Sequence, residues 1–224
     1  MNKIKIITLA TLSCVIFSSC LKSSFYVSGH NTFANVKDAN TLIADGISTY
    51  HIVENASTSD FKDSHRLFIN CDLQNWNDDS SFDVKLNDFV EVQEYDAVDK
   101  MHSTISSKDD IDFQFFVNQL VSGNEDGVIY INLWIQIPSI KGSDVEHRIE
   151  LVYEPDSDVQ NTFKFYLYHD AAGDVWTDDV PEDQREIKAF WASFHIEDLY
   201  KDLEWEWNSS SKVEVYAASS KDQK

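Results

Sequence analysis

The sequence is poor in residues that interrupt or cross-link a chain, with 6 glycines, 3 prolines and 3 cysteines among 224 residues. So little glycine and proline excludes a collagen-like protein or a linker. Positive charge is also scarce, because 18 Lys and Arg stand against 39 Asp and Glu, for a net charge of −21. A nucleic-acid-binding protein needs clustered Lys and Arg to displace counterions from phosphates. We therefore expect no nucleic-acid partner.

Long hydrophobic runs are missing as well. Beyond the N-terminal segment, no stretch of the sequence approaches the roughly 18 apolar residues that a transmembrane helix needs. Hydrophobic residues nevertheless make up 42% of the chain and aromatic residues 13%. That is enough apolar surface to offset the ordering entropy that keeps polar chains disordered. The length fits one large domain or two small ones.

The first twenty residues carry the pattern of an export signal. Lys3 and Lys5 precede an uncharged, mostly apolar stretch at Ile6–Phe17, which has the length of a secretory core and is too short to span a bilayer. Phe17-Ser18-Ser19-Cys20 is similar to a bacterial lipobox, whose cysteine receives a diacylglycerol. We predict a signal peptide at residues 1–19 and lipid attachment at Cys20. The alternative is an ordinary signal peptide with a cysteine there by chance.

The lipid anchor predicts a location. Several acyl chains, at about 0.8 kcal/mol per buried CH₂, hold a protein on a membrane more durably than a single myristoyl chain. Leu21 follows Cys20, whereas Asp at that position resembles an inner-membrane retention signal of Gram-negative bacteria. No acidic residue occurs before Asp38, although surface-exported lipoproteins often carry an acidic run there. We expect a lipid-anchored protein of the outer membrane, on the periplasmic side in preference to the cell surface.

The composition of the segment after the signal peptide predicts a tether, and the positions of the cysteines exclude an internal disulfide. Residues 20–45 are rich in Ser, Asn and Thr and show little periodicity, so we expect the lipidated cysteine and a tether with at most one edge strand. Cys14 leaves with the signal peptide and Cys20 is acylated, so Cys71 has no partner for an internal disulfide. Cys71 lies on the apolar side of an alternating run, which predicts a buried, small hydrophobic side chain.

Polar and apolar residues alternate through most of the exported part. Such alternation indicates strands with one face on a core and one in water, and hence antiparallel pairing. Only Ile196–Leu203 has apolar residues at helical spacing. The strands are expected at residues 47–53, 66–73, 82–86, 89–95, 111–115, 128–137, 146–153, 162–169, 187–196 and 212–217.

A glycine-containing acidic segment, Gly123–Gly127, is the best boundary between two groups of strands, because it reads as a solvated turn or short linker. We therefore predict an all-β protein of two domains. A small OB-like barrel is expected at residues 46–122, followed by an antiparallel β-sandwich at residues 127–218.

Five segments carry motifs that can be compared with a known family: Asp88–Val92, Tyr130–Leu133, Glu146–Val152, Phe165–Asp174 and Phe190–Leu199. They resemble strand motifs of the NigD-like lipoproteins. That family pairs an N-terminal OB-like barrel with a C-terminal β-sandwich and has no established enzymatic activity, so the resemblance implies architecture more than function. The sequence departs from the family pattern at Asp170, at His195-Ile196 and in an acidic insertion at Val175–Arg185.

Residues that carry chemistry are sparse. His147 and His169 fall in or at the ends of expected strands, where two imidazoles can meet across a sheet and bind a metal. The preferred interpretation is that each caps a turn or is a satisfied, half-buried ring. Acidic loops supply oxygen ligands without the spacing of a calcium loop, so we expect solvated surface charge and neither a defined metal site nor a cofactor. These loops are Asp78–Ser81, Asp156–Asp158 and Asp174–Asp179.

Tryptophans are the best candidates for ligand contact. Trp134 and Trp191 lie among apolar residues and are expected in the core, whereas Trp176 lies in an acidic loop and is expected to be exposed. Glu204 and Glu206 share one face of a strand, which does not give two carboxyls across a cleft as a glycosidase needs. We expect a non-catalytic binding or assembly module with an envelope protein partner. The alternatives are a surface carbohydrate-binding accessory protein, with Trp176 contacting the sugar, and a hydrolase on the sandwich face.

Overall fold

The computed structural model describes residues 26–46, 48–55, 61, 65–78, 80–115, 121–123, 128–154, 162–202 and 212–218. The predicted signal peptide, Cys20, the centre of the Gly123–Gly127 segment, the Asp156–Asp158 loop and Glu204 with Glu206 lie outside these residues. Within the described part the chain forms thirteen strands and two short helices. The prediction of an all-β protein is confirmed.

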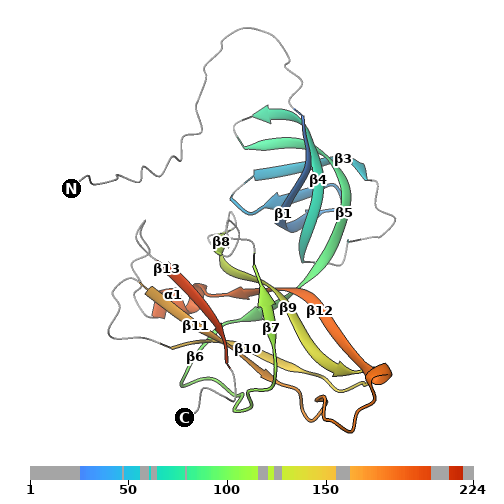
Figure 1. The fold of residues 1–224 in the computed structure, drawn as a ribbon. Helices are drawn as coiled ribbons and strands as arrows, with labels where there is room; N and C mark the ends of the chain where they lie inside the picture. Colours follow the sequence, from blue (N-terminus) through green and yellow to red (C-terminus); the bar gives the residue numbers. More distant parts are fainter. Residues whose placement is uncertain are drawn as a thin grey trace, which may run out of the picture.

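The first five strands close into a small barrel (Figure 1). They are β1 (Val27–Asp38), β2 (Thr41–Ala44), β3 (Ser48–Asn55), β4 (Arg66–Asp78) and β5 (Ser81–Asp96). The pairing order is β3-β2-β1-β4-β5, and a further pairing of β3 with β5 closes the circle. Alternate apolar residues point inward, so the expected OB-like barrel is present. Its interior contains Ala34, Leu42, Ala44, Tyr50, Phe61, Leu67, Ile69, Cys71, Leu73, Val84 and Leu86.

The expected tether overlaps two of these barrel strands. β1 and β2 lie inside residues 20–45, and their side chains at Phe33, Ala34 and Leu42 are at most 1% exposed. The tether prediction is therefore wrong from Val27 onward. The apolar residues of this segment come in short groups separated by a turn after Asp38, so no single window shows a long alternation.

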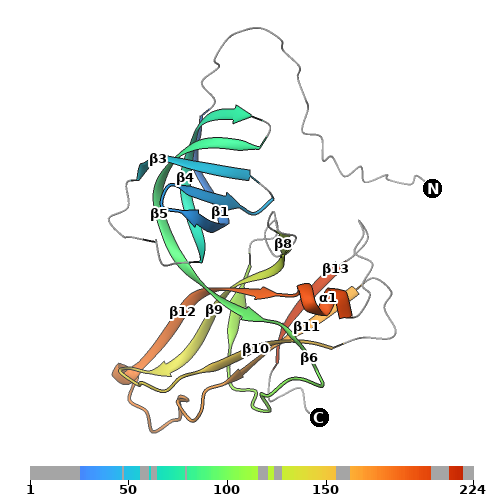
Figure 2. The same ribbon diagram turned by 180° about the vertical axis from the view of Figure 1, so that it is seen from behind.

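β5 belongs to both parts of the molecule (Figure 2). Residues up to Glu91 pair with β4 inside the barrel, and residues 92–96 pair with β12 (Arg185–His195) in the sandwich. β6 (Val98–Asp99) and β7 (Asp112–Gln114) also pair with sandwich strands. The two parts therefore divide within β5, not at the Gly123–Gly127 segment, because a turn signal in the sequence does not tell which strands pair.

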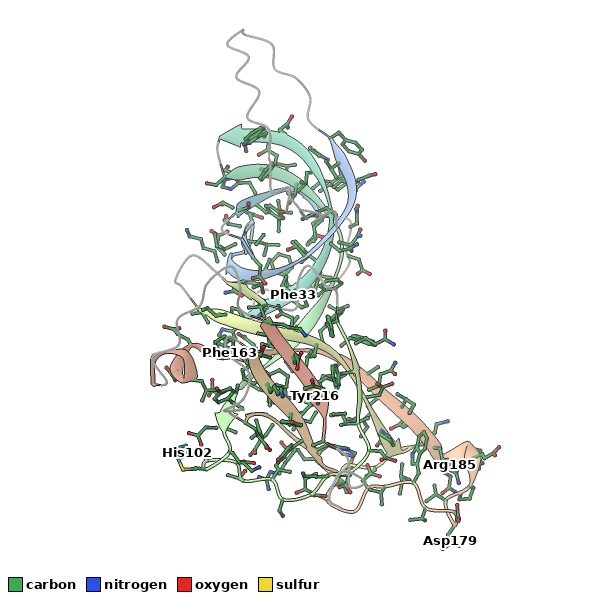
Figure 3. All side chains as sticks on the ribbon, turned by 60° about the vertical axis from the view of Figure 1, so that its left-hand side comes forward. Phe33, His102, Phe163, Asp179, Arg185 and Tyr216 are labelled. Atoms are coloured by element: carbon green, nitrogen blue, oxygen red, sulfur yellow. The ribbon has the colours of Figure 1, made fainter. Side chains whose placement is uncertain are left out.

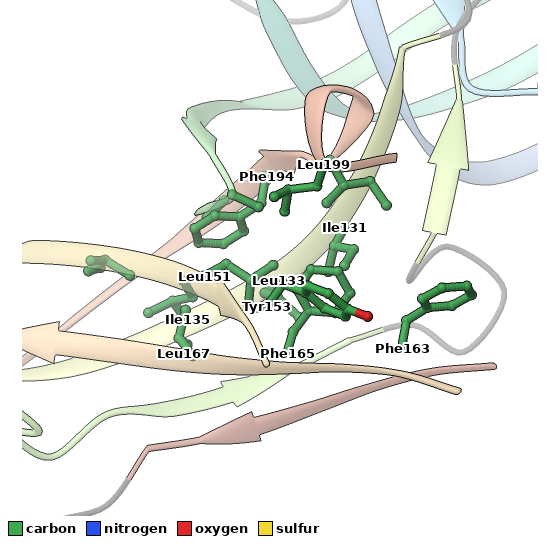
Figure 4. Close-up of a cluster of buried hydrophobic side chains, with 14 of the residues drawn as sticks. Ile131, Leu133, Ile135, Leu151, Tyr153, Phe163, Phe165, Leu167, Phe194 and Leu199 are labelled. Carbon is green, nitrogen blue, oxygen red and sulfur yellow. The ribbon is translucent and has the colours of Figure 1, made fainter. Parts of the chain in front are cut away.

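Two sheets form the sandwich. One extends the barrel sheet through β12, β9 (Ile129–Ile140), β7 and β8 (Val121–Gly123). The second has the order β13 (Lys212–Ala217), β11 (Thr162–Asp170), β10 (Arg148–Tyr153) and β6. Figure 4 shows the apolar side chains between them, such as Leu133, Leu151 and Phe165, each fully buried.

Short helices flank β12. The helix η1 (Glu182–Gln184) precedes it, and α1 (Glu197–Asp202) follows it, within the segment whose spacing predicted a helix. No helix of the described residues is long and apolar enough to cross a membrane.

The expectation of purely antiparallel pairing is wrong at four places. The pairs β3–β5, β12–β5, β11–β13 and β10–β6 are parallel. Alternation reports only that one face of a strand is buried. The direction of each neighbour follows from how the chain connects the strands across the barrel and sandwich.

Arg66 joins the barrel to the sandwich. Its buried guanidinium pairs with Asp45 through Nη1–Oδ1 at 3.0 Å and Nη2–Oδ2 at 2.6 Å. Nε donates to Ser193 Oγ at 2.8 Å, Nη2 to Asn132 Oδ1 at 3.1 Å, and Nη1 to Asn35 Oδ1 at 2.8 Å. All five N–H groups of the guanidinium thus have acceptors, drawn from both parts of the molecule.

Candidate functional site

A pocket of about 400 Å³ opens beside Trp176. Its walls come from the loop before β7, from the end of β9, and from the end of β11 with the loop that follows. Arg185 and Asp179, labelled in Figure 3, mark the neighbouring loop at the end of the sandwich away from the barrel. The lining residues are Ser107, Lys108, Asp109, Asp110, Pro138, His169, Ala171, Val175 and Trp176.

Trp176 is 36% exposed, which confirms its predicted exposure. Its indole Nε1 donates to the carbonyl oxygen of Ser139 at 2.7 Å, and the Arg185 guanidinium carbon lies 6.0 Å from the ring centroid. The hydrogen bond holds the ring in place and uses its one polar group. What Trp176 offers to a ligand is therefore the apolar face of the indole.

Acidic side chains lie on the other wall. The Asp109 carboxylate accepts hydrogen bonds from Ser107 Oγ at 2.9 Å and from the Ala171 amide at 2.8 Å. It is thereby committed to fixing the loop against the end of β11. Asp110 follows with an exposed side chain, and its backbone carbonyl accepts a hydrogen bond from His169 Nδ1 at 2.9 Å. Lys108 adds a positive charge, 5.0 Å from the ring of Tyr168.

Behind the pocket, His169, His147 and Asp174 form a buried row of polar side chains. Nε2 of His169 lies 2.8 Å from Nδ1 of His147, whose Nε2 lies 2.8 Å from Oδ2 of Asp174. The two ring centroids are 5.0 Å apart with an angle of 19° between the planes. Together with the short nitrogen–nitrogen distance, this shows rings joined edge to edge through one hydrogen bond. The row runs from the pocket wall into the sandwich.

Asp174 closes the row. Its carboxylate also accepts hydrogen bonds from Ser139 Oγ at 2.9 Å and from the Ile140 amide at 2.8 Å. Burial raises the pKa of this group, but the hydrogen bonds from His147, Ile140 and Ser139 outweigh burial and bring the pKa down to about 2. Burial, with the neighbouring His147, lowers the pKa of His169 below its ordinary value despite the opposing bond to Asp110.

Asp174 corrects the expectation that its loop carries only solvated charge. The residue is 3% exposed, whereas Asp178 and Asp179 in the same loop are exposed. The tight turn at Ala172 and Gly173, both with positive φ, brings Asp174 back over the ends of β9 and β10. No spacing rule links an acidic loop residue to a histidine 27 positions earlier, so this contact could not be predicted from the sequence.

His147 and His169 lie in contact, and each is a ring whose hydrogen bonds are satisfied, as the preferred interpretation of the sequence predicted. Both nitrogens of both rings are engaged in hydrogen bonds within the row. Among the described residues there is no group of three or more His, Cys, Asp or Glu side chains placed to hold a metal ion. Neither ring has a free nitrogen for a metal or a substrate in this arrangement.

The burial of Trp134, Trp191 and Cys71 can be compared with the predictions from the sequence. Trp191 is 7% exposed, as expected, but Trp134 is half-buried and lines a second pocket of about 310 Å³ with Gln114, Phe115 and Trp191.

Cys71 is fully buried in the barrel, and burial, reinforced by Asp72, raises the pKa of its thiol to about 12. Its prediction as a buried hydrophobic residue is confirmed.

Comparison with known proteins shows that solved structures share this fold. No family model matches the sequence, and a search of curated proteins finds no match. Several solved structures are similar. A protein of unknown function, DUF1344, from Bacteroides vulgatus is 14% identical, with a TM-score of 0.55 over 85% of this chain and 83% of that one. A NigD-like immunity protein from Bacteroides caccae is 15% identical, with a TM-score of 0.50 over 85% of this chain and 86% of the other.

At these identities the likeness concerns the fold alone. The coverage includes both the barrel and the sandwich, because it extends over most of each chain. The resemblance that the strand motifs predict is confirmed at this level: the chain has the fold of a NigD-like protein.

Proposed function

We propose that this chain is a non-catalytic binding protein of the cell envelope, held in the outer membrane by lipid on Cys20 and facing the periplasm. Its ligand site is the pocket beside Trp176. The observation that carries this proposal is that both ring nitrogens of His169, the imidazole in the pocket wall, are engaged in hydrogen bonds within the protein. The groups that remain for a ligand are the indole face of Trp176 and the charges of Lys108 and Asp110.

The hydrogen bonds of His169 support a non-catalytic role. A general base must reach the proton that it abstracts, directly or through one water. His169 has one nitrogen on the Asp110 carbonyl and the other on His147, so it presents only carbon atoms to the pocket. The Asp109 carboxylate accepts two hydrogen bonds on Oδ2, one from Ser107 of its own loop and one from Ala171, the residue after β11.

The remaining groups suit recognition of an envelope protein. The indole face of Trp176 offers an apolar contact, and Asp110 and Lys108 beside it offer one charge of each sign. A large aromatic side chain in a pocket with a polar rim is the usual anchor of a protein interface. A protruding side chain of a partner, with a polar group at its tip, fits this combination.

Cross-linking tests the assignment. The lipidated protein is purified from cross-linked cells as the native chain, as Trp176→Ala and as Trp76→Ala. Trp76 is 55% exposed on the barrel and serves as the matched control. We expect an envelope protein that co-purifies with the native chain and with Trp76→Ala but not with Trp176→Ala. Equal recovery from all three would show that the pocket is not the binding site.

A carbohydrate is the second candidate ligand, favoured by one observation. The flat indole of Trp176 lies in the same pocket as the carboxylates of Asp109 and Asp110, and sugars present C–H faces to aromatic rings and hydroxyl donors to carboxylates. Binding to an oligosaccharide panel, lost in Trp176→Ala and retained in Trp76→Ala, would establish this function. A panel without binding to the native chain would exclude it for the sugars tested.

A further inference from the structure

The hydrogen bonds of the histidine row fix how many protons it contains. The Asp110 carbonyl only accepts, so Nδ1 of His169 carries a proton. The ionised carboxylate of Asp174 also only accepts, so Nε2 of His147 carries a proton. Two ring nitrogens only 2.8 Å apart require one more proton between them, because two lone pairs at that distance repel. These are three protons on two rings, whereas two neutral imidazoles carry two, so the row holds one extra proton and one positive charge.

The same row holds both walls of the Trp176 pocket. At one end, His169 binds the backbone of Asp110, which belongs to the acidic wall. At the other end, Asp174 binds Ser139 through its hydroxyl and Ile140 through its amide. The carbonyl of Ser139 in turn fixes the indole of Trp176. A continuous chain of hydrogen bonds therefore connects one wall to the other.

We propose that His147, His169 and Asp174 form a proton-dependent latch, which keeps the Trp176 pocket in its binding shape only while the two rings share the extra proton. This regulation rests on the proposed function of the pocket as a ligand site. When the pair loses that proton as the pH rises, two protons remain for three hydrogen bonds. One of the three contacts then sets acceptor against acceptor and opens.

The surroundings of the row decide how firmly the proton is held. Burial opposes a positive charge on His169 and lowers its pKa. Asp174, which faces His147 directly, and Asp109, beside His169 on the pocket loop, favour the positive charge. Asp110 and Lys108 line the same pocket with opposite charges. On the other side of His147 lies a hollow of about 350 Å³ that includes Tyr95 of β5 and Lys188 of β12. The positive charge of Lys188 disfavours a positive charge on His147.

Only one extra proton fits this geometry. Both rings fully protonated would place two N–H groups against each other at the 2.8 Å contact between His147 and His169. The two rings therefore hold one extra proton between them and not one each.

NMR of the full exported chain, labelled with ¹⁵N, tests the latch without any ligand. We expect the ring nitrogens of His147 and His169 to shift in one common step as the pH is raised. The indole N–H of Trp176 should move at the same midpoint, because its acceptor Ser139 loses its support. Separate midpoints for the two histidines, or a Trp176 signal that does not follow them, would overturn the proposal.

Two variants sharpen the test. In Asp174→Asn the side-chain amide donates to His147, so two neutral rings satisfy the row and the pH step of Trp176 should disappear. His102→Gln is the control, because His102 is an exposed histidine that pairs with Asp99 and does not line the pocket; it should leave the step unchanged. A step that survives in Asp174→Asn would contradict the latch. Ligand or partner binding is measured separately, so its absence would refute the proposed function and not the latch.

Discussion

Arg66 of the barrel donates through Nε to Ser193 Oγ of the sandwich at 2.8 Å. The same guanidinium lies over the ring of Tyr130, with its carbon 3.8 Å from the ring centroid. A single buried side chain thus contacts β9 and β12 while its charge is balanced by Asp45. Since a charge buried without its partner is costly, this contact ties the position of the barrel to that of the sandwich.

Replacing Arg66 should therefore destabilise the whole chain. Arg66→Met leaves the Asp45 carboxylate buried without its cation, and we expect a loss of about 3–5 kcal/mol in the free energy of unfolding. Urea unfolding, followed by tryptophan fluorescence, measures this change. Lys100→Met breaks an exposed pair with Glu154 and should leave the unfolding midpoint nearly unchanged. An equally small effect of both substitutions would contradict a structural role for Arg66.

Asp174 makes stability depend on pH at the acidic end. Its folded-state pKa of about 2 lies below the value in an unfolded chain, so the contribution is fully present above about pH 4 and is lost as the pH falls towards 2. The loss should be about 2 kcal/mol. Melting temperatures of the native chain and of Asp174→Asn, taken over this range, check it. The difference between the two should shrink as the pH falls; a constant difference would count against the assignment.

The thiol of Cys71 should be inert in the folded chain. It is fully buried, and burial raises its pKa to about 12, so almost no thiolate exists at neutral pH. A Cys20→Ala chain that lacks the signal peptide contains Cys71 as its one cysteine. Labelling with a thiol reagent should be negligible in buffer and complete in denaturant. Rapid labelling of the folded chain would show that the barrel opens readily.

Lipid attachment predicts where the protein is found after cell fractionation. The native chain should stay with the membranes, whereas Cys20→Ala should release the protein into the soluble fraction because the acyl chains hold it there. Cys71→Ala provides the matched control, since it changes a cysteine without removing the anchor. Membrane retention of Cys20→Ala would refute the lipobox interpretation.

The side of the outer membrane needs a measurement of its own. Protease is added to intact cells and to lysed cells, and the tagged chain is detected by blotting. Protection until lysis is expected for a periplasmic protein. Degradation on intact cells would place the protein on the surface and would favour the carbohydrate candidate over an envelope partner.

Much of the fold follows from local pattern. The alternation in Arg66–Leu73 and in Thr162–His169 predicted strands that the structure contains as β4 and β11. The spacing of Ile196, Leu199 and Leu203 predicted the helix α1. These patterns succeed because burial of one face of a strand or helix leaves a periodic trace in the sequence. The same alternation predicts the burial of Cys71, whereas the exposure of Trp176 follows from its place in an acidic loop.

Tertiary structure alone decided the rest. The closure of the barrel by the parallel pairing of β3 with β5, and the passage of β5 into the sandwich, depend on contacts between distant residues. The row from His169 to Asp174 likewise joins side chains that no local pattern relates. Amino-acid sequence by itself determined which faces are buried, because periodicity is local. Which strands pair, and which polar groups share a proton, depends on contacts between distant segments, and only the folded chain brings these together.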